Sequence, residues 1–483
     1  MKTIFVAVNS QYIHTLLAPR YLSANAVGQD VEIYECNANM DMDKVTQDIM
    51  ALKPDVIAFS CYIFNIVFVK RLLSDLRKVA PQCKIILGGY EVEYCVAEYL
   101  PLCDYIITGE GDFAFGQLLN AISEGVKLPT RVIDGGRVQI LDEINSPYTA
   151  EYCALGKTKI LYFESSRGCP FSCSYCMSAN TLGVRTFSLE RTFSDLKHIM
   201  TYSPKQIKFV DRTFNFDMSR ATKIFEYIID NFGETSTNFH FEMAPELFSA
   251  EMLQVLKKAK AGLFQFEIGV QSYNYNTLSV VGRRVNVEKV EENLRALVAL
   301  NTIHIHVDLI AGLPQEDIQS FVAGFNRLYC IGAHCLQLGF LKVLKGSLME
   351  KQSDGYEVGS MPPYEVLSSP MLTYNEILQL KEAEHMLERY KNSGRFVESI
   401  AFLLPKYFSP YEFFLGIARY TESVMKGKVV SSYYQSNLLY EYATKEVIID
   451  SEDDYSSFCS ALACAIASDY KNSGNARAWK KRV

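Results

Sequence analysis

The stretch Glu164–Ala179, ESSRGCPFSCSYCMSA, carries three cysteines, Cys169, Cys173 and Cys176, with the spacing C-x3-C-x2-C. Three thiolates on one short loop can bind three irons of a 4Fe-4S cube and leave the fourth iron open to another ligand. A closed structural zinc site takes four ligands, usually as two C-x2-C pairs, and the sequence has no second pair. The spacing therefore favours an iron–sulfur cluster over zinc, and over a chance arrangement of the 13 cysteines.

The cysteine stretch directly follows the first of six apolar segments that alternate with helical patterns, such as residues 250–262 and 287–301. Six strand–helix units without an early reversal predict a parallel barrel or partial barrel, with reactive groups at the carboxyl ends of the strands. The predicted strands are KILYFESS (159–166), QIKFVDRTF (206–214), NFHFEMAP (238–245), LFQFEIGVQS (263–272), IHIHVDLIAG (303–312) and CLQLGFLKVL (335–344).

A separate alternation occupies residues 1–125, with the apolar runs TIFVAV, VEIYECN, DVIAFSC, KIILGG and DYIITG. Five such units predict a doubly wound parallel sheet of flavodoxin-like type. Ligands of these sheets bind outside the carboxyl ends of the strands. Those ends are NSQYIH (9–14), SCYIFN (60–65), GGYEVE (88–93) and TGEGD (108–112).

Two changes of pattern suggest the domain boundaries. Residues 125–155 lack helical periodicity and form a joint, and the residues after 350 are rich in Tyr and Phe and become helical. We therefore expect an α/β protein with a flavodoxin-like doubly wound parallel sheet in residues 1–135, a partial (β/α)6 barrel in 136–350 and a mostly helical C-terminal domain in 351–483 that caps the barrel or holds the substrate.

Composition excludes several classes of protein. The chain has 483 residues, 49% of them hydrophobic, and a net charge of −7, whereas a generic nucleic-acid binder needs a basic surface. The longest apolar runs are of strand length, so we expect no membrane span. The first residues, MKTIFVAVNS, read as a buried strand rather than an export signal. The cysteines are then reduced thiols or metal ligands in a cytoplasmic protein.

The cysteine loop resembles that of the radical SAM superfamily, in which an aromatic residue precedes the third cysteine, as Tyr175 does here. The resemblance implies that the three cysteines hold the cluster and that S-adenosylmethionine (SAM) chelates the open iron through its amine and carboxylate. One electron, from a donor such as flavodoxin or ferredoxin, would cleave the C5′–S bond and give a 5′-deoxyadenosyl radical. The cofactors supply this chemistry, and the protein orients and shields them.

Further segments match the SAM contacts of the superfamily at the ends of barrel strands. Asp211 would meet the methionine amine, or it caps the following helix, and the Gly-Gly-Glu form common in the superfamily is absent. Alternate residues of one strand face the same side, so Glu267 and Gln271 would both reach the ribose. Arg283 or its neighbour would meet the SAM carboxylate, because guanidinium binds carboxylates bidentately. The candidate SAM-binding residues are Tyr175, Asp211, Glu267, Gln271, Arg283 and Asp308.

The segment DLIAGLPQE, residues 308–316, resembles the fifth-strand motif near the adenine. Its glycine, Gly312, permits a close approach of the backbone. Glu316 is expected to begin a helix rather than to contact a ligand. His304 and His306 alternate along the predicted strand and would line a polar barrel interior.

A flavodoxin-like domain before such a barrel resembles the cobalamin-binding members of the superfamily. The Asp-x-His-x-x-Gly signature of the methionine-synthase type is absent, so we expect no imidazole from that motif on cobalt. His14 would face the corrin or cap a helix. The glycines would let the corrinoid approach the backbone, or they simply end strands. The candidate cobalamin-binding residues are His14, Ser60, Tyr62, Gly88, Gly89, Tyr90, Gly109, Glu110 and Gly111.

The resemblance implies a cobalamin-dependent radical enzyme, often a methyltransferase that acts on an unactivated carbon. In that case one SAM donates the methyl group and another supplies the radical, so S-adenosylhomocysteine and 5′-deoxyadenosine form in about equal amounts. The alternatives are a radical SAM oxidoreductase or cyclase without methyl transfer, and a corrinoid or iron–sulfur sensor. A small metabolite, a peptide and a modified RNA base all remain possible substrates. The C-terminal domain resembles an uncharacterised helical tail of some such proteins.

Overall fold

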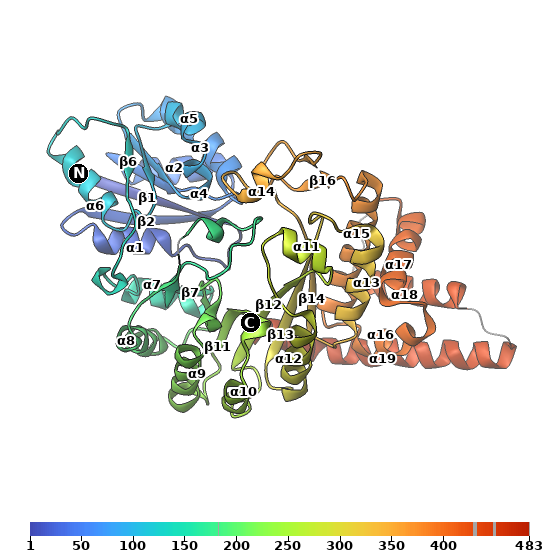
Figure 1. Ribbon diagram of the computed structural model, residues 1–483. Helices are drawn as coiled ribbons and strands as arrows, with labels where there is room; N and C mark the ends of the chain where they lie inside the picture. The colour runs from blue at the N-terminus through green and yellow to red at the C-terminus, as the bar shows by residue number, and fades with distance from the viewer. Residues whose placement is uncertain (182, 428–431, 448–450, 483) are drawn as a thin grey trace. The chain divides into compact units, whose positions relative to one another are not determined.

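The structure is a computed structural model that describes residues 1–181, 183–427, 432–447 and 451–482 (Figure 1). The chain forms two compact units. Unit 1 comprises Met1–Glu242, Lys342–Ser353 and Gly359–Glu365, and unit 2 comprises Met243–Leu341, Asp354–Val358 and Val366–Val483. Within the described ranges, no helix combines the length and the apolar character that crossing a membrane requires.

Six parallel strands form the N-terminal sheet of unit 1, in the order β2-β1-β3-β4-β5-β6. β1 is almost wholly buried, because it lies between β2 and β3 with Val6 opposite Tyr34 on one side and Phe59 on the other. The order reverses between β1 and β3, as in flavodoxin-like sheets, so the predicted fold of this region is confirmed. The strands are β1 (Lys2–Asn9), β2 (Asp30–Asn37), β3 (Val56–Ser60), β4 (Lys84–Gly88), β5 (Tyr105–Thr108) and β6 (Val132–Asp134).

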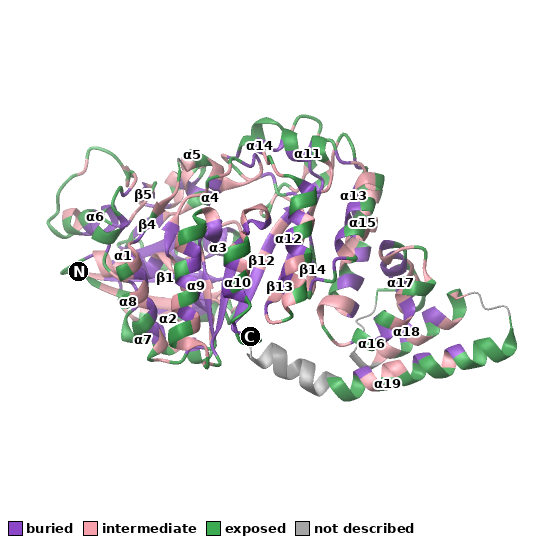
Figure 2. Ribbon diagram, turned by 60° about the horizontal axis from the view of Figure 1, so that its bottom comes forward, coloured by how far each residue is buried: buried purple, intermediate pink, exposed green. Residues whose placement is uncertain are grey.

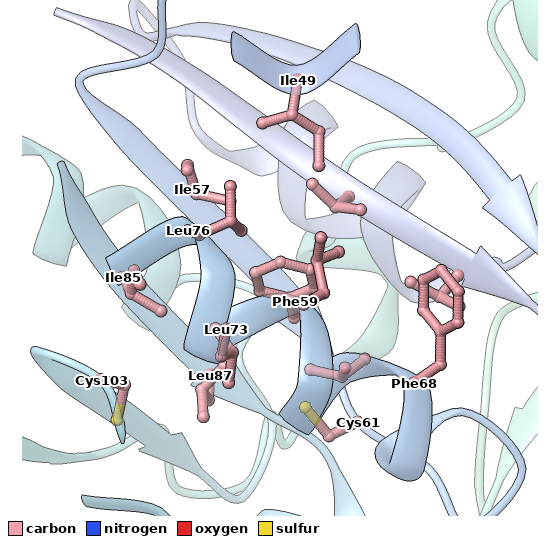
Figure 3. Packing of buried hydrophobic residues seen from close by; sticks show 14 of the residues in the cluster. Ile49, Ile57, Phe59, Cys61, Phe68, Leu73, Leu76, Ile85, Leu87 and Cys103 are labelled. Atoms are coloured by element: carbon pink, nitrogen blue, oxygen red, sulfur yellow. The ribbon is translucent and has the colours of Figure 1, made fainter. Parts of the chain in front are cut away.

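Helices cover both faces of this sheet. On one face, Ile57 and Phe59 of β3 join Leu73 and Leu76 of α3 in a buried cluster (Figure 3), and full burial of each such side chain contributes about 1.5–3 kcal/mol. α1 and α6 cover the other face, where Phe115 packs, while the outward surfaces of the helices are exposed (Figure 2). The helices are α1 (Ala18–Asn25), α2 (Met42–Ala51), α3 (Ile66–Val79), α4 (Tyr90–Glu93), α5 (Val96–Tyr99) and α6 (Ala114–Ser123).

The expected joint at residues 125–155 is more structured than its sequence indicates. β6 extends the sheet by pairing parallel to β5, with Val132 opposite Ile106. A short helix, α7 (Ala150–Ala154), follows and begins at Thr149, whose side chain accepts from the backbone N–H of Tyr152. β6 is three residues long and not fully buried, so it has no alternation of apolar and polar residues from which it could have been predicted.

The six strands predicted after the joint are all present and parallel to their neighbours. In unit 1, β7, β10 and β11 lie in the order β11-β10-β7, and in unit 2, β12, β13 and β14 lie in the order β14-β13-β12. The strands are β7 (Leu161–Phe163), β10 (Gln206–Phe209), β11 (Asn238–Met243), β12 (Phe264–Gln271), β13 (His304–Ala311) and β14 (Cys335–Phe340). The helices between them are α8 (Leu189–Met200), α9 (Met218–Phe232), α10 (Ala250–Leu256), α11 (Tyr275–Val280), α12 (Val287–Leu300) and α13 (Ile318–Tyr329).

Two features of unit 1 were not predicted. The cysteine loop lies between two short antiparallel strands, β8 (Ser166–Arg167) and β9 (Arg185–Thr186). The chain also returns to unit 1 after β14 with the segments Lys342–Ser353 and Gly359–Glu365, which we call the strap. The strap contains the short helix α14 (Leu348–Lys351).

The C-terminal region of unit 2 is helical, as predicted. It opens with a small antiparallel pair, and α15 begins with a capping box in which Thr373 and Glu376 bond to each other's backbone N–H groups. The elements are β15 (Glu357–Val358), β16 (Val366–Ser368), α15 (Tyr374–Met386), α16 (Val397–Leu403), α17 (Pro410–Met425), α18 (Ser432–Glu446) and α19 (Glu452–Arg482).

Candidate functional site

The cysteine loop, Gly168–Gly183, is closed at its base by its two terminal glycines. Gly168 has a φ of +102°, and a side chain there would lie 2.2 Å from the carbonyl oxygen of Gly183. Cys173 is buried, whereas Cys169 and Cys176 are partly exposed. The loop tightens between the last two cysteines, because the N–H of Cys176 donates to the carbonyl of Cys173 at 3.0 Å. The three predicted ligands therefore lie on one short closed loop.

The donor set of this loop fits a cluster with one open iron. It offers three thiols and no fourth ligand from the same loop, and the Sγ of Cys169 lies 3.4 Å from the Oγ1 of Thr213. In the part of the chain that the structure describes, no three His, Cys, Asp or Glu side chains form a group that could hold one metal ion. A 4Fe-4S cube differs from a single ion because it takes its thiolates on separate irons.

Asp211 holds the start of the cysteine loop. Its carboxylate is 1% exposed and accepts three hydrogen bonds, from the N–H of Ser165 at 2.9 Å and from the hydroxyls of Ser165 at 2.6 Å and Ser166 at 2.5 Å. Burial raises the pKa of Asp211, although these bonds oppose the shift. The helix-cap alternative is wrong, because α9 is capped by Asp217.

A mostly half-buried ion-pair network joins both strands beside the cysteine loop to the N-terminal sheet. Arg167 of β8 donates to Asp112 at 2.7 and 3.0 Å and to Glu164 at 3.0 Å. Arg185 of β9 donates to both carboxylate oxygens of Glu110. Burial would lower the pKa of Arg167, but Glu164 and Asp112 raise it well above its usual value. Sequence reasoning assigned Glu110 to cobalamin and missed the network, whose members are far apart in sequence.

The loop Gly109–Gly111 is covered by the chain itself. The N–H of Glu110 donates to the carbonyl of Gly136 at 2.9 Å. A side chain at Gly109 would lie 2.6 Å from that same oxygen, and one at Gly135 would lie 2.3 Å from the carbonyl oxygen of Glu110. The glycines are therefore required by two backbone segments that cross closely, which explains them without a bound corrinoid.

The paired glycines at the end of β4 also have a reason within the fold. Gly89 has a φ of +99°, and a side chain there would lie 2.6 Å from the carbonyl oxygen of Cys61. Nearby aromatic side chains do reach solvent, since Tyr90 is 41% exposed and Phe64 is 43% exposed. The rings of Tyr62 and Phe64 stack with centroids 5.3 Å apart. The carboxyl edge of the sheet thus presents planar apolar groups, which suit a large planar ligand. Ser60, the remaining candidate here, is buried at the end of β3.

His14 contacts the first barrel strand. Its Nδ1 lies 2.7 Å from the hydroxyl of Tyr162 on β7, and burial together with the charge of Lys208 lowers its pKa. The alternative that His14 caps a helix is wrong, because the N-cap of α1 is Leu17, without a side-chain bond. His14 therefore packs against the first of the strands after the joint.

Arg212 is a candidate that sequence reasoning missed. Its guanidinium lies 4.0 Å from the carboxylate of Glu242 and is more than half exposed. Partial desolvation by its surroundings would lower the pKa of Arg212, but Glu242, Cys176, Tyr90 and Cys169 together raise it. This cation is therefore within electrostatic reach of the cysteine loop and of the carboxyl edge of the N-terminal sheet. The sequence signal that could have identified Arg212 is its position just after the carboxyl end of β10.

In unit 2, the predicted alternation along β12 is confirmed. Glu267 and Gln271 are half-buried and lie on the same face as Gly269, whereas the residues between them are buried. Arg283 donates through Nη2 to the carbonyl of Gly269 at 2.5 Å, and Asp308 of β13 lies opposite Gly269 in the register. The structure thus brings these four candidates to neighbouring positions within unit 2.

Glu316 lies just before α13, whose N-cap is Asp317. It is 1% exposed, and its Oε1 accepts from the hydroxyl of Ser272 at 2.5 Å. Burial raises the pKa of Glu316 to about 7. His304 and His306 lie on one half-buried face of β13, with ring centroids 4.8 Å apart.

Three family models match the chain. The B12 binding domain matches residues 4–119, the Radical SAM superfamily matches residues 163–327, and the Protein of unknown function (DUF4080) matches residues 354–482. Together they cover the doubly wound sheet, the strands around the cysteine loop and the helical region.

Two characterised relatives are methyltransferases. The 2-(S-pantetheinyl)-carbapenam-3-carboxylate methyltransferase of Streptantibioticus cattleyicolor is 25% identical over 321 residues, which are 58% of this chain and 46% of that protein. The cobalamin-dependent radical SAM methyltransferase TokK of Streptomyces tokunonensis is 24% identical over 324 residues, which are 59% of this chain and 46% of that protein. The chain thus matches less than half the length of each relative.

A solved structure has the same fold over nearly the whole chain. The cobalamin-dependent SAM radical enzyme OxsB with aqua-cobalamin bound superposes with a TM-score of 0.64 at 14% identity, over 98% of this chain and 84% of that one. Family models and fold agree on the order of the domains. The chain therefore combines, in this order, matches to the B12 binding domain, the Radical SAM superfamily and the Protein of unknown function (DUF4080), and it is similar to cobalamin-dependent radical SAM enzymes.

Proposed function

We propose that this chain is a cobalamin-dependent enzyme that reductively cleaves SAM and transfers a methyl group to an unactivated carbon of its substrate. The observation that supports the proposal most is the ion-pair network in unit 1. Arg167 and Arg185, which flank the cysteine loop, bond to Asp112 and Glu110 at the carboxyl edge of the N-terminal sheet. Such sheets bind their ligands at that edge, so the network links the predicted sites of both cofactors.

The cluster would be held by Cys169, Cys173 and Cys176, and when bound it supplies the electron that cleaves SAM. The chain's own contribution is to orient the loop through Asp211 and the two serines. Arg212 adds a positive charge within electrostatic reach of this loop. The SAM contacts proposed are Tyr175, Asp211, Glu267, Gln271, Arg283 and Asp308.

Cobalamin, when bound, supplies a carrier for the methyl group. The exposed ring of Tyr90 and the half-buried ring of Tyr62 would cover part of its ring. The Asp-x-His-x-x-Gly signature is absent and the Nδ1 of His14 lies against Tyr162, so the proposed role of His14 is to line the site rather than to bind cobalt. The other proposed contacts are Ser60, Gly88, Gly89, Gly109, Glu110 and Gly111.

Domain limits and partners complete the proposal. The cobalamin domain would span residues 1–135, the radical SAM domain 136–350 and the C-terminal domain 351–483. The electron donor would be a flavodoxin or ferredoxin, and the substrate a small metabolite, a peptide or a modified RNA base. No disulfide joins any of the 13 cysteines, all of which lie in the described ranges, and this suits a reducing compartment such as the cytoplasm.

The test is anaerobic reconstitution of the full chain, followed by product analysis without added substrate. After reconstitution with iron and sulfide, we expect about four irons per chain and, with a strong reductant, slow release of 5′-deoxyadenosine from SAM. Added hydroxocobalamin and reductant should then give about one S-adenosylhomocysteine per bound corrinoid. A variant with all three cysteines changed to Ala is the control and should lose iron and deoxyadenosine.

The outcomes separate the alternatives. Deoxyadenosine without S-adenosylhomocysteine would leave a radical SAM oxidoreductase or cyclase and exclude the methyltransferase. Iron and corrinoid without either product would favour a sensor. Zinc in the native protein, with no uptake of iron, would contradict the proposal as a whole.

A further inference from the structure

The strap crosses two functional regions of unit 1 that are distant from it in sequence. It closes on itself through the N–H of Val343, which donates to the carbonyl of Tyr364 at 3.0 Å. Its short helix α14 begins at Ser347, and both Ser347 and Met349 are fully buried. The strap is thus a packed element of unit 1 rather than a loose connection.

One side of the strap bonds to the cysteine loop. The N–H of Met349 donates to the carbonyl of Ser174 at 2.8 Å, so the strap is attached between Cys173 and Cys176. Asn180, near the end of the loop, donates through Nδ2 to the carbonyl of Gly346 at 2.9 Å. Two contacts therefore hold the part of the loop that carries the last two cysteines.

The strap also bonds to the segment that follows the paired glycines of the N-terminal sheet. This segment consists of α4 and Tyr94, and we call it the Tyr94 turn. The hydroxyl of Tyr364 donates to the carboxylate of Glu91, which is 2% exposed. Lys345 lies over the ring of Tyr364, 5.6 Å from its centroid. Asn180 contacts this turn as well, since its Nδ2 lies 3.0 Å from the hydroxyl of Tyr94.

Gly346 is the point where these contacts meet. Its φ is +78°, and a side chain there would lie 2.1 Å from the ring of Tyr94. The ring cannot move aside without losing the bond between its hydroxyl and Asn180. Only glycine therefore lets the strap, the cysteine loop and the Tyr94 turn meet at this place.

We propose that the strap is a positioning element, which fixes the cysteine loop against the carboxyl edge of the N-terminal sheet through Ser174, Asn180, Glu91 and Tyr94. The proposal rests on the proposed function only for the identity of the two cofactors. The strap acts on the chain that would hold them, and so sets how rigidly the cysteine loop faces the carboxyl edge of the N-terminal sheet.

Hydrogen exchange of the full chain, both without cofactors and after reconstitution, tests this role. Gly346→Ala should speed exchange in peptides covering 169–181 and 90–99 about tenfold, which corresponds to about 1.4 kcal/mol. Gly28→Ala is the matched control, because Gly28 also has a positive φ, +80°, but has no atom within 4 Å of an added side chain. It should leave both peptides unchanged.

A second variant covers the case in which Gly346→Ala fails to fold. Tyr364→Phe removes the hydroxyl that donates to Glu91 and keeps the ring, so exchange should rise about threefold or more in the 90–99 peptide, consistent with the loss of one buried hydrogen bond. In the reconstituted protein, both variants should keep about four irons but weaken the change that SAM causes in the electron paramagnetic resonance spectrum of the reduced cluster. A merely structural segment would not alter that response.

The results distinguish this inference from the proposed function. Exchange within about twofold of Gly28→Ala, less than 0.5 kcal/mol, in both peptides of Gly346→Ala, or in the 90–99 peptide of Tyr364→Phe where Gly346→Ala does not fold, would overturn the positioning role while iron uptake still supports the enzyme. Absence of iron from the wild-type protein would defeat the proposed function. The exchange comparison in the cofactor-free chain would still decide whether the strap holds the loop.

Discussion

Arg167 donates hydrogen bonds to Asp112 through both of its terminal nitrogens, from Nη1 to Oδ2 at 2.7 Å and from Nη2 to Oδ1 at 3.0 Å. The side chain of Arg167 is 14% exposed and that of Asp112 is 6% exposed. This bidentate pair joins the strand before the cysteine loop to the loop after β5. A buried, bidentate ion pair is geometrically specific, so it fixes both the distance and the orientation between these two parts of unit 1.

Removing one partner of this pair should destabilise unit 1 strongly. Arg167→Met leaves the carboxylate of Asp112 buried without its guanidinium, which typically costs about 3–5 kcal/mol. We expect a lower unfolding temperature and faster hydrogen exchange in residues 166–186. Arg71→Met, at an exposed position of α3, is the control. An unfolding temperature equal to that of the control would show that the pair adds nothing to stability.

Asp211→Asn separates a loop-holding role from a SAM-binding role. The amide keeps one acceptor oxygen but places an NH2 group against donors from Ser165 and Ser166. We expect the hydrogen bonds that hold the cysteine loop to become less favourable by about 1–3 kcal/mol in total. Iron retention should then fall severalfold. The control is Asp217→Asn, because Asn caps helices about as well as Asp. If Asp211→Asn retained iron fully and lost only its affinity for SAM, the amine contact first expected from the sequence would be correct.

The bound corrinoid should lack a protein imidazole on cobalt. The sequence lacks the Asp-x-His-x-x-Gly signature, and the Nδ1 of His14 lies 2.7 Å from the hydroxyl of Tyr162. We expect the electron paramagnetic resonance spectrum of the bound Co(II) form to show no nitrogen splitting from the protein, and His14→Gln to leave this spectrum unchanged. Nitrogen splitting that disappears in His14→Gln would assign the axial ligand to His14.

Glu316 should make the stability of unit 2 depend on pH. Its folded-state pKa of about 7 lies above the usual 4.5, so the folded chain binds this proton more tightly than the unfolded chain. The favourable contribution is complete below pH 4.5 and is lost as the pH rises to 7. The difference is about 3 kcal/mol.

Glu316→Gln stays neutral and retains an acceptor for Ser272. Its unfolding temperature should exceed that of the wild type at pH 8 and match it at pH 5. Glu226→Gln, at an exposed position of α9, is the control. Its unfolding temperature should match that of the wild type at both pH 8 and pH 5. Parallel curves for the wild type and Glu316→Gln from pH 5 to pH 8 would show that Glu316 does not titrate in this range.

The sequence was informative wherever a pattern is local. Both sets of parallel strands and the alternation of Glu267, Gly269 and Gln271 follow from periodicity within single segments, and the structure confirms them. The cysteine loop was found because its spacing is dictated by the geometry of a cluster. Each of these signals lies within a short stretch of residues.

The contacts that join distant segments could not be predicted. The glycine-rich loop around Glu110 gives no sign that the carboxylate of Glu110 is bonded to Arg185, 75 residues away. The bond between Tyr364 and Glu91 spans 273 residues. No periodicity marks either pair, because a buried partner is chosen by the folded surface and not by its neighbours in sequence.

The return of the strap to unit 1 constrains when a nascent chain can receive its cluster. Tyr364 follows Cys176 by roughly 190 residues, which a ribosome adds in roughly 10–40 s at about 5–20 residues per second. Until then the cysteine loop lacks its contacts with Met349 and Gly346. The loop therefore reaches its final shape only after most of the polypeptide has emerged, and a cluster inserted before then would bind a loop that the strap does not yet hold.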